Sequence, residues 1–161
     1  MPTSFVNREV HINDASELDL IETVIAVLAE GRSVELPAVG YSMFPTLKPG
    51  DKVMIIPILK NEIPESGNIV VFRNNDMLIM HRLIKILQDE PEKDNFIARG
   101  DSMAECDKTI PAQQLIGVAV SYKRGGKEQK LKVILPCKIK YKFNRFVLWF
   151  FFKMKKFKPY F

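Results

Sequence analysis

The sequence predicts a mainly β protein: a compact domain of coiled, mostly antiparallel β-sheet, with an N-terminal helix and a C-terminal basic, aromatic helix. Short β-like runs recur between residues 33 and 120, and turn residues separate them. An amphipathic segment precedes these runs, and a cationic, aromatic stretch follows them. We therefore expect an N-terminal helical segment at 1–32, a β domain at 33–135 and a basic aromatic tail at 136–161.

Length and composition exclude several classes of protein. A chain of 161 residues suits one domain, at roughly 100–200 residues per domain. Apolar residues make up 47% of the chain and charged residues 27%, so it should bury a core rather than stay disordered. Its two cysteines, Cys106 and Cys137, and its two histidines, His11 and His81, lack the number and spacing of a disulfide framework or a zinc site. We expect no bound metal and no cofactor.

The segment before residue 31 has the pattern of one capped helix. Apolar residues from Leu18 to Leu28 follow a helical spacing, polar residues at 14–17 precede them, and Gly31 follows, so the helix should end near Glu30. A helix packed on the domain is favoured over a docking helix for a partner. Its glutamates and short length exclude a membrane span. The polar start of the chain shows no signal-peptide pattern, which predicts a cytoplasmic or peripheral membrane protein.

The β domain contains six predicted strands. Turn residues lie between them, as at Pro49-Gly50-Asp51 and Asn74-Asn75-Asp76. A further run, LKVIL at 131–135, is a candidate strand after the Gly125-Gly126 turn. The six runs are VELPAV (34–39), KVMIIPI (52–58), GNIVVF (67–72), MLIMHRLIKIL (77–87), NFIARG (95–100) and LIGVAV (115–120).

Charge is distributed very unevenly along the chain. Residues 1–120 carry 11 basic and 18 acidic side chains, whereas residues 121–161 carry 13 basic and one acidic. The apolar run Phe146–Phe152 is far shorter than the roughly 20 residues that cross a bilayer, and cations flank it. Aromatic rings beside cations suit the headgroup boundary of an anionic membrane. For residues 138–158 we favour this peripheral contact over a core or oligomer contact, and we expect no nucleic-acid partner.

One serine lies in a segment that could expose its hydroxyl. Ser42 follows Gly40, and Pro45 stands at the third position after it, which predicts a rigid loop with free backbone N–H groups nearby. A hydroxyl held in this way becomes a nucleophile when a base is near. On this segment alone, a turn residue without chemistry is the commoner interpretation.

His81 is the candidate base, because it is the only histidine in the predicted β domain. Strand alternation places it on the face of Ile79 and Leu83, opposite Met80 and Arg82, and partly buried. A neutral imidazole there could accept a serine proton near pH 7. A lone histidine on an apolar strand face is more often a core residue.

An imidazole base usually needs an acceptor, and two carboxylates follow a later strand. Asp101 and Asp107 lie in the stretch after Arg99-Gly100, and either could approach His81 if the strands are neighbours. Each could instead close a turn or cap the next segment. The spacing does not choose between them.

Together these segments resemble the signal peptidase I family and its relatives, the self-cleaving repressor-type serine peptidases. The resemblance runs from about Val39 to Val120, half of the chain, with residue types in the family's order and spacing. It implies the coiled β fold of these peptidases and a serine endopeptidase that cleaves an extended precursor or leader peptide. The matching motifs are G-x-S-M-x-P-T-L-x-x-G-D (40–51), G-x-I-V-x-F (67–72), H-R-L-I-x-I (81–86), G-D-x-x-x-x-x-D (100–107) and I-G-x-A (116–119).

The resemblance assigns roles to the candidate residues. Ser42 corresponds to the nucleophile. His81 falls where bacterial signal peptidases and the repressors have a general-base lysine and where the endoplasmic-reticulum and archaeal branch has histidine, so the chain looks closest to that Ser-His-Asp branch. The pattern of this branch makes Asp107 the catalytic aspartate and Asp101 a residue that organises the site.

Three departures limit the likeness. Gly40 stands where many signal peptidases have serine, which leaves the backbone N–H groups of Ser42 and Met43 as oxyanion donors. We expect no N-terminal transmembrane anchor, and the one helix predicted before Gly31 cannot form a helix-turn-helix. A non-catalytic peptide-binding module and a self-cleaving regulator are the alternative functions.

Overall fold

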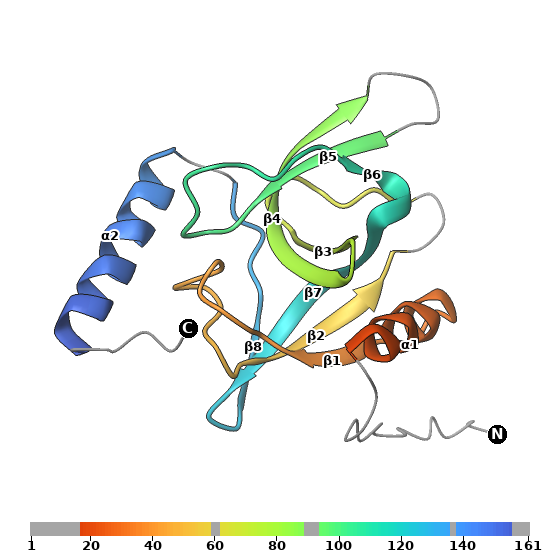
Figure 1. The fold of residues 1–161 in the computed structure, drawn as a ribbon, viewed down its shortest axis with the longest axis horizontal. Coiled ribbons are helices and arrows are strands. Elements are labelled where there is room, and N and C mark those ends of the chain that lie inside the picture. The colour runs from red at the N-terminus through yellow and green to blue at the C-terminus, as the bar shows by residue number, and fades with distance from the viewer. Residues whose placement is uncertain (1–16, 59–61, 89–93, 136–137, 156–161) are drawn as a thin grey trace.

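The computed structural model describes residues 17–58, 62–88, 94–135 and 138–155. Within these ranges the protein has one antiparallel sheet of eight strands and two α-helices, which confirms the predicted mainly β class (Figure 1). The elements are α1 (Glu17–Ala29), β1 (Val34–Pro37), β2 (Lys52–Pro57), β3 (Ile69–Asn74), β4 (Met77–Gln88), β5 (Asp94–Arg99), β6 (Ile110–Pro111), the 3-10 helix η1 (Ala112–Gln114), β7 (Leu115–Arg124), β8 (Lys127–Lys130) and α2 (Lys138–Lys155).

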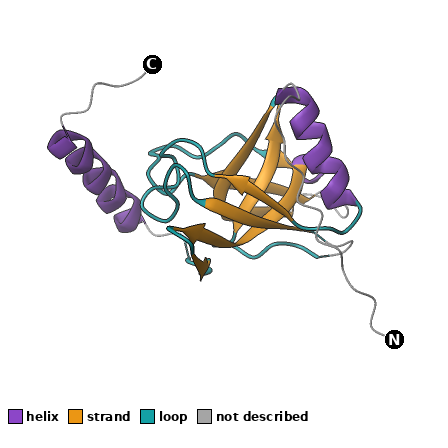
Figure 2. Cartoon of the chain, turned by 90° about the horizontal axis from the view of Figure 1, so that it is seen from below, coloured by secondary structure: helices purple, strands orange, loops and turns teal. Residues whose placement is uncertain are grey.

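The sheet is long, bent and strongly curved. Its strands follow the order β1-β2-β7-β3-β4-β5-β6, and β8 pairs with β7. Register shifts interrupt the pairings β2–β7, β3–β7 and β4–β5, and such bulges increase the local bend and twist of a strand. In Figure 2, α1 lies against the strands while α2 stands beyond the far side of the domain. The two helices therefore have different surroundings.

The tight hairpins form where the sequence permits a positive φ. Asn75 joins β3 to β4 with φ 52°, and Gly125 and Gly126 join β7 to β8 with φ 56° and 78°. Two-residue hairpin turns favour Asn and Gly at such positions because other side chains clash there. Each of the six predicted runs overlaps one strand. The pairings β1–β2, β3–β4, β4–β5, β5–β6 and β7–β8 connect strands that are neighbours along the chain.

The prediction of a strand at 131–135 is wrong. The strand after the glycine turn is β8, a polar segment with every residue exposed, and the LKVIL run that follows has no strand conformation. After Leu131 donates to Val120, the run leaves β7 and crosses to Gly67, whose carbonyl accepts from Ile134 at 3.3 Å. Leu135 is left exposed. The short β6 was also not predicted, because two residues carry no periodic pattern.

Two groups of buried side chains form the core on the two sides of β3. Ile69 and Val71 face the first group, which includes Val53 and Ile55 of β2 and part of α1. Val70 and Phe72 face the second group, which includes residues of β4, β5 and β6. Because β3 is buried on both faces, its central run is continuously apolar rather than alternating.

Helix α1 packs on the domain, as the favoured interpretation of its sequence predicted. Ile21, Val24 and Leu28 are buried at helical spacing. The helix ends close to Glu30, where Gly31 with φ 80° donates to the Leu28 carbonyl. The polar residues at 14–16 that were predicted to cap it lie outside the described residues. Neither helix in the described part of the chain is long and apolar enough to cross a bilayer.

One buried carboxylate fixes the loop between β1 and β2, which carries Ser42. Asp51 is 3% exposed, receives two hydrogen bonds from Arg124 of β7 at 2.6 and 2.8 Å, and accepts a third from the backbone N–H of Lys48. Arg124 also donates to the Thr46 carbonyl in the same loop. Burial raises the pKa of Asp51, but the hydrogen bonds from Arg124 and Lys48 outweigh it and hold that pKa below the ordinary 3.8.

Replacing Asp51 by Asn should therefore destabilise the protein in a pH-dependent way. We expect the free energy of unfolding near pH 7 to fall by about 2 kcal/mol, as for the loss of a charged hydrogen-bond partner. Since the folded pKa is lowered, this difference between wild type and variant is complete above about pH 4 and disappears as the pH falls through the folded value. Denaturant unfolding across this range measures it, with Asp76→Asn in the exposed β3–β4 turn as the control. A difference that stays constant down to about pH 3 would contradict this account.

Candidate active site

Ser42 lies in a series of turns between β1 and β2. Met43 and Leu47 point into the core on either side of the chain reversal, and the N–H of Leu47 donates to the Met43 carbonyl at 3.0 Å. Ser42 itself is only partly buried. Its carbonyl accepts from both the N–H and the hydroxyl of Ser102, at 2.9 and 3.0 Å. The Ser42 turn is thus held by the burial of Met43 and Leu47 in the core and by hydrogen bonds from Ser102 in the loop after β5.

His81 lies in the middle of β4, on the face that the strand pattern predicted. Its ring meets Phe72 of β3 edge-on at 6.3 Å, and the neighbouring Ile79 and Leu83 belong to the same core group. The side chain is 9% exposed. Its Nδ1 atom lies 2.6 Å from Oδ2 of Asp107, so with the proton on Nδ1 the imidazole donates to the carboxylate and Nε2 is left as an acceptor.

Asp107 and Asp101 occupy different places although six residues separate them. Asp107 follows β5, and its backbone N–H donates to the Ala98 carbonyl at 2.8 Å, which directs its carboxylate toward His81. Asp101 instead binds Arg82 through two hydrogen bonds of 2.7 Å each and accepts from the Thr46 hydroxyl. The choice that the spacing left open is settled by contact: Asp107 is the partner of the imidazole.

Arg82 has a structural role in this region that its sequence position did not reveal. It lies opposite His81 on β4, as predicted, and its guanidinium also donates to the Gly67 carbonyl at 2.7 Å. The side chains of Arg82 and Asp101 are 4% and 9% exposed. A buried arginine next to the histidine was the available signal, because a buried cation requires a buried anion. Asn144 of α2, which donates to the Asp101 carbonyl at 3.0 Å, gave no comparable signal.

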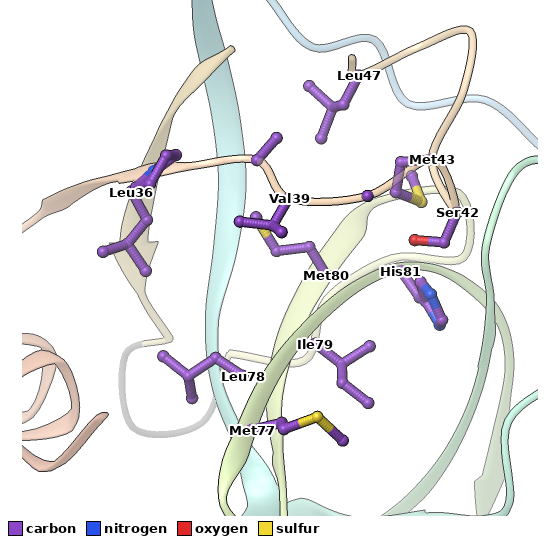
Figure 3. A pocket seen from close by; sticks show the side chains of 13 residues that line it. Leu36, Val39, Ser42, Met43, Leu47, Met77, Leu78, Ile79, Met80 and His81 are labelled. Carbon is purple, nitrogen blue, oxygen red and sulfur yellow. The ribbon is translucent and has the colours of Figure 1, made fainter. Parts of the chain in front are cut away.

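A groove of about 310 Å³ runs past Ser42 and His81 (Figure 3). It lies between residues 36–40 at the end of β1 and residues 77–81 of β4, and most of its lining is apolar. Figure 3 shows the Ser42 and His81 side chains at the same end of this groove. Among the described residues, no hydrogen bond joins the Ser42 hydroxyl to His81. The lining residues are Leu36, Pro37, Ala38, Val39, Gly40, Ser42, Met43, Leu47, Met77, Leu78, Ile79, Met80 and His81.

Both walls of the groove are open strand edges. Among the described strands, β1 pairs only with β2, and β4 pairs with β5 only from Arg82 onward. The edge of residues 77–81 opposite β3 therefore has no described strand beside it. The backbone N–H groups of Ser42 and Met43 donate to no other described residue. The groove therefore offers free main-chain donors and acceptors on both sides and at its end.

The described residues contain no group of three or more His, Cys, Asp or Glu side chains that could hold a metal ion. Cys106 is an exposed free thiol, and Cys137 lies outside the described residues.

No protein-family model matches the sequence, and no curated protein matches it either. Ser42, His81 and Asp107 remain the residues whose geometry points to chemistry.

The contact between the Ser42 turn and the loop after β5 requires a glycine. A Cβ atom at Gly100 would lie 2.6 Å from the Ser42 carbonyl oxygen and 2.6 Å from Cγ of Met103. We expect Gly100→Ala to lower the free energy of unfolding by about 1–3 kcal/mol, as for other overpacked sites. Chemical denaturation measures the change, and Ala104→Ser in the same loop, where the side chain is exposed, is the control. Equal stability of both variants would show that the Ser42 turn moves aside freely.

Proposed function

We propose that the chain is a serine endopeptidase of the signal peptidase type, which cleaves extended precursor or leader peptides. The observation that carries this proposal is the 2.6 Å contact between Nδ1 of His81 and Asp107, on an imidazole that shares a groove with the Ser42 hydroxyl. Asp107 keeps the proton on Nδ1, so Nε2 can act as a base toward the groove. Ser42 supplies the hydroxyl, because it lines the same groove as this ring.

The reaction follows from these positions. Nε2 of His81 takes the proton of the Ser42 hydroxyl while Oγ attacks the peptide carbonyl carbon, and the carbonyl oxygen becomes an oxyanion. The N–H groups of Ser42 and Met43, which donate to no other described residue, are the donors for that oxyanion. His81 then gives its proton to the leaving amine as the C–N bond breaks. Water, deprotonated by His81, hydrolyses the acyl-enzyme and restores Ser42.

The two open strand edges suit a substrate in extended conformation. A peptide lying in the groove would pair its backbone with residues 36–39 on one side and with residues 77–81 on the other. Main-chain hydrogen bonds would hold the peptide independently of most of its sequence, and the apolar lining would accept apolar side chains. Binding would also exclude water from the Ser42–His81 gap, where catalytic hydrogen bonds commonly tighten only in the complex.

Triad variants test the proposal. We expect Ser42→Ala and His81→Ala each to lower kcat/KM for cleavage of a susceptible peptide by at least about 10³-fold, because triad members act as a unit. Asp107→Asn should lose about as much, since the wrong tautomer of His81 is then stabilised. Mass spectrometry of a peptide library incubated with each protein finds the susceptible sequences and measures their cleavage. Ser33→Ala, at an exposed serine outside the groove, is the control; cleavage that survives Ser42→Ala would refute the proposal.

A non-catalytic peptide-binding module is the second candidate, and the missing hydrogen bond between Ser42 and His81 favours it. Such a module would retain library peptides without cutting them, and wild type and Ser42→Ala would bind them equally. A serine-directed acylating probe separates the two candidates, because labelling at Ser42 requires an activated hydroxyl. A self-cleaving regulator would instead give a fragment of the purified wild-type chain at raised pH that Ser42→Ala does not give.

A further inference from the structure

Helix α2 presents one face to the domain. Asn144 is buried and donates to the Asp101 carbonyl, and the ring of Tyr141 lies 4.3 Å below the Arg99 guanidinium. About two turns further along, at 3.6 residues per turn, Phe151 contacts the ring of Phe44, with 5.6 Å between the ring centroids. These contacts are spaced as one side of a helix. The inner face of α2 thus rests on the loop after β5 and on the Ser42 turn.

The outer face of α2 is unusually apolar for an exposed surface. Its aromatic side chains are between 50% and 64% exposed, and no described segment covers them. Exposed cations lie among these rings, and Lys153 stands 4.9 Å over the ring of Trp149. The helix contains no aspartate or glutamate. The exposed aromatic residues of this face are Phe143, Phe146, Trp149 and Phe150, and the exposed cations are Lys142, Arg145 and Lys153.

We propose that the outer face of α2 lies in the headgroup region of an anionic membrane. Its rings would enter the acyl boundary while its cations meet lipid phosphates, which is how basic amphipathic helices bind in the plane of a bilayer. A second copy of the chain is disfavoured as the occupant, because pairing two such faces would set cations against cations with no carboxylate on either helix to neutralise them. The proposal depends on α2 and not on catalysis by Ser42.

This docking would place the groove at a fixed position above the membrane. The inner face of α2 contacts Tyr41, with the Phe152 ring 4.9 Å from it, and Tyr41 precedes Ser42 directly. A membrane-bound α2 therefore holds the Ser42 turn close to the lipid surface. If the proposed peptidase function is correct, the favoured substrates are peptides that emerge from, or lie on, that surface.

Trp149 reports on the contact, since it is the only tryptophan of the chain. The full-length Ser42→Ala protein is mixed with vesicles of phosphatidylcholine alone or with about a third phosphatidylglycerol, so that lipid binding is measured without cleavage. We expect a blue shift of Trp149 emission, and quenching by brominated acyl chains, with the anionic vesicles. Neutral vesicles should bind much more weakly, and added salt should weaken the anionic binding.

Two pairs of substitutions separate the apolar and electrostatic parts of binding. Phe146→Ser with Phe150→Ser should lower the vesicle partition coefficient by about tenfold or more. Lys142→Gln with Arg145→Gln should lower it by about 25-fold, from about fivefold per cation. Ile63→Ser, at an exposed apolar residue outside α2, is the control, and circular dichroism confirms that each variant is folded.

Four results would overturn the proposal. One is that Trp149 emission does not shift when anionic vesicles are added. Another is that the Phe146/Phe150 double variant partitions onto vesicles as strongly as the control. The third is a lipid-independent blue shift that grows with protein concentration while sedimentation shows a dimer, since α2 would then be a protein interface. Binding to duplex DNA but not to vesicles at the same salt would equally exclude the membrane. None of these outcomes touches the peptidase proposal, which the Ser42 variants test separately.

Discussion

The ion pair between Arg82 and Asp101 ties together the parts of the candidate site. Both side chains are almost wholly buried, so each charge must be neutralised where it lies. The guanidinium satisfies this by binding the Asp101 carboxylate twice and the Gly67 carbonyl once, and no buried side-chain N or O atom in the described residues lacks a partner. The pair contributes geometry more than stability: it fixes the loop after β5 against β4. The Ser42 turn is attached to that loop through Ser102.

Strand β4 makes two different contacts of the candidate site because it is pleated. His81 and Arg82 are consecutive in β4 and therefore point to opposite faces. His81 meets Asp107, and Arg82 meets Asp101, so a single loop after β5 supplies an anion to each face of the same strand. The separation between the two aspartates is what allows this loop to reach both faces. A shift of the β4–β5 register by one residue would break both contacts together.

Much of the fold was predictable because it rests on local signals. Apolar runs predicted six strands, turn residues predicted the turns at Asn75 and Gly125-Gly126, and strand alternation predicted the face of His81. The LKVIL run was misassigned because apolar, β-branched composition predicts a strand even where the neighbouring strand, β7, is already paired by β2 and β3 on its two sides. Asp107 could be preferred over Asp101 only through the family resemblance, since the difference lies in contacts to a distant strand. The contact between Asn144 and Asp101 was unpredictable for the same reason, because no local sequence pattern shows which loop a C-terminal helix will contact.

The Ser42 turn has two neighbours that are not independent of each other. On one side its hydroxyl opens on the groove, and on the other its aromatic residues Tyr41 and Phe44 pack against Phe151 and Phe152 of α2. Aromatic contacts of this kind favour particular ring geometries, so a change in the position of α2 would change the position of the Ser42 turn. Asn144 adds a second connection, from α2 to the backbone of Asp101. A ligand of the outer face of α2 that changed the position of the helix would therefore change the position of Ser42 through packed side chains, without movement of the sheet.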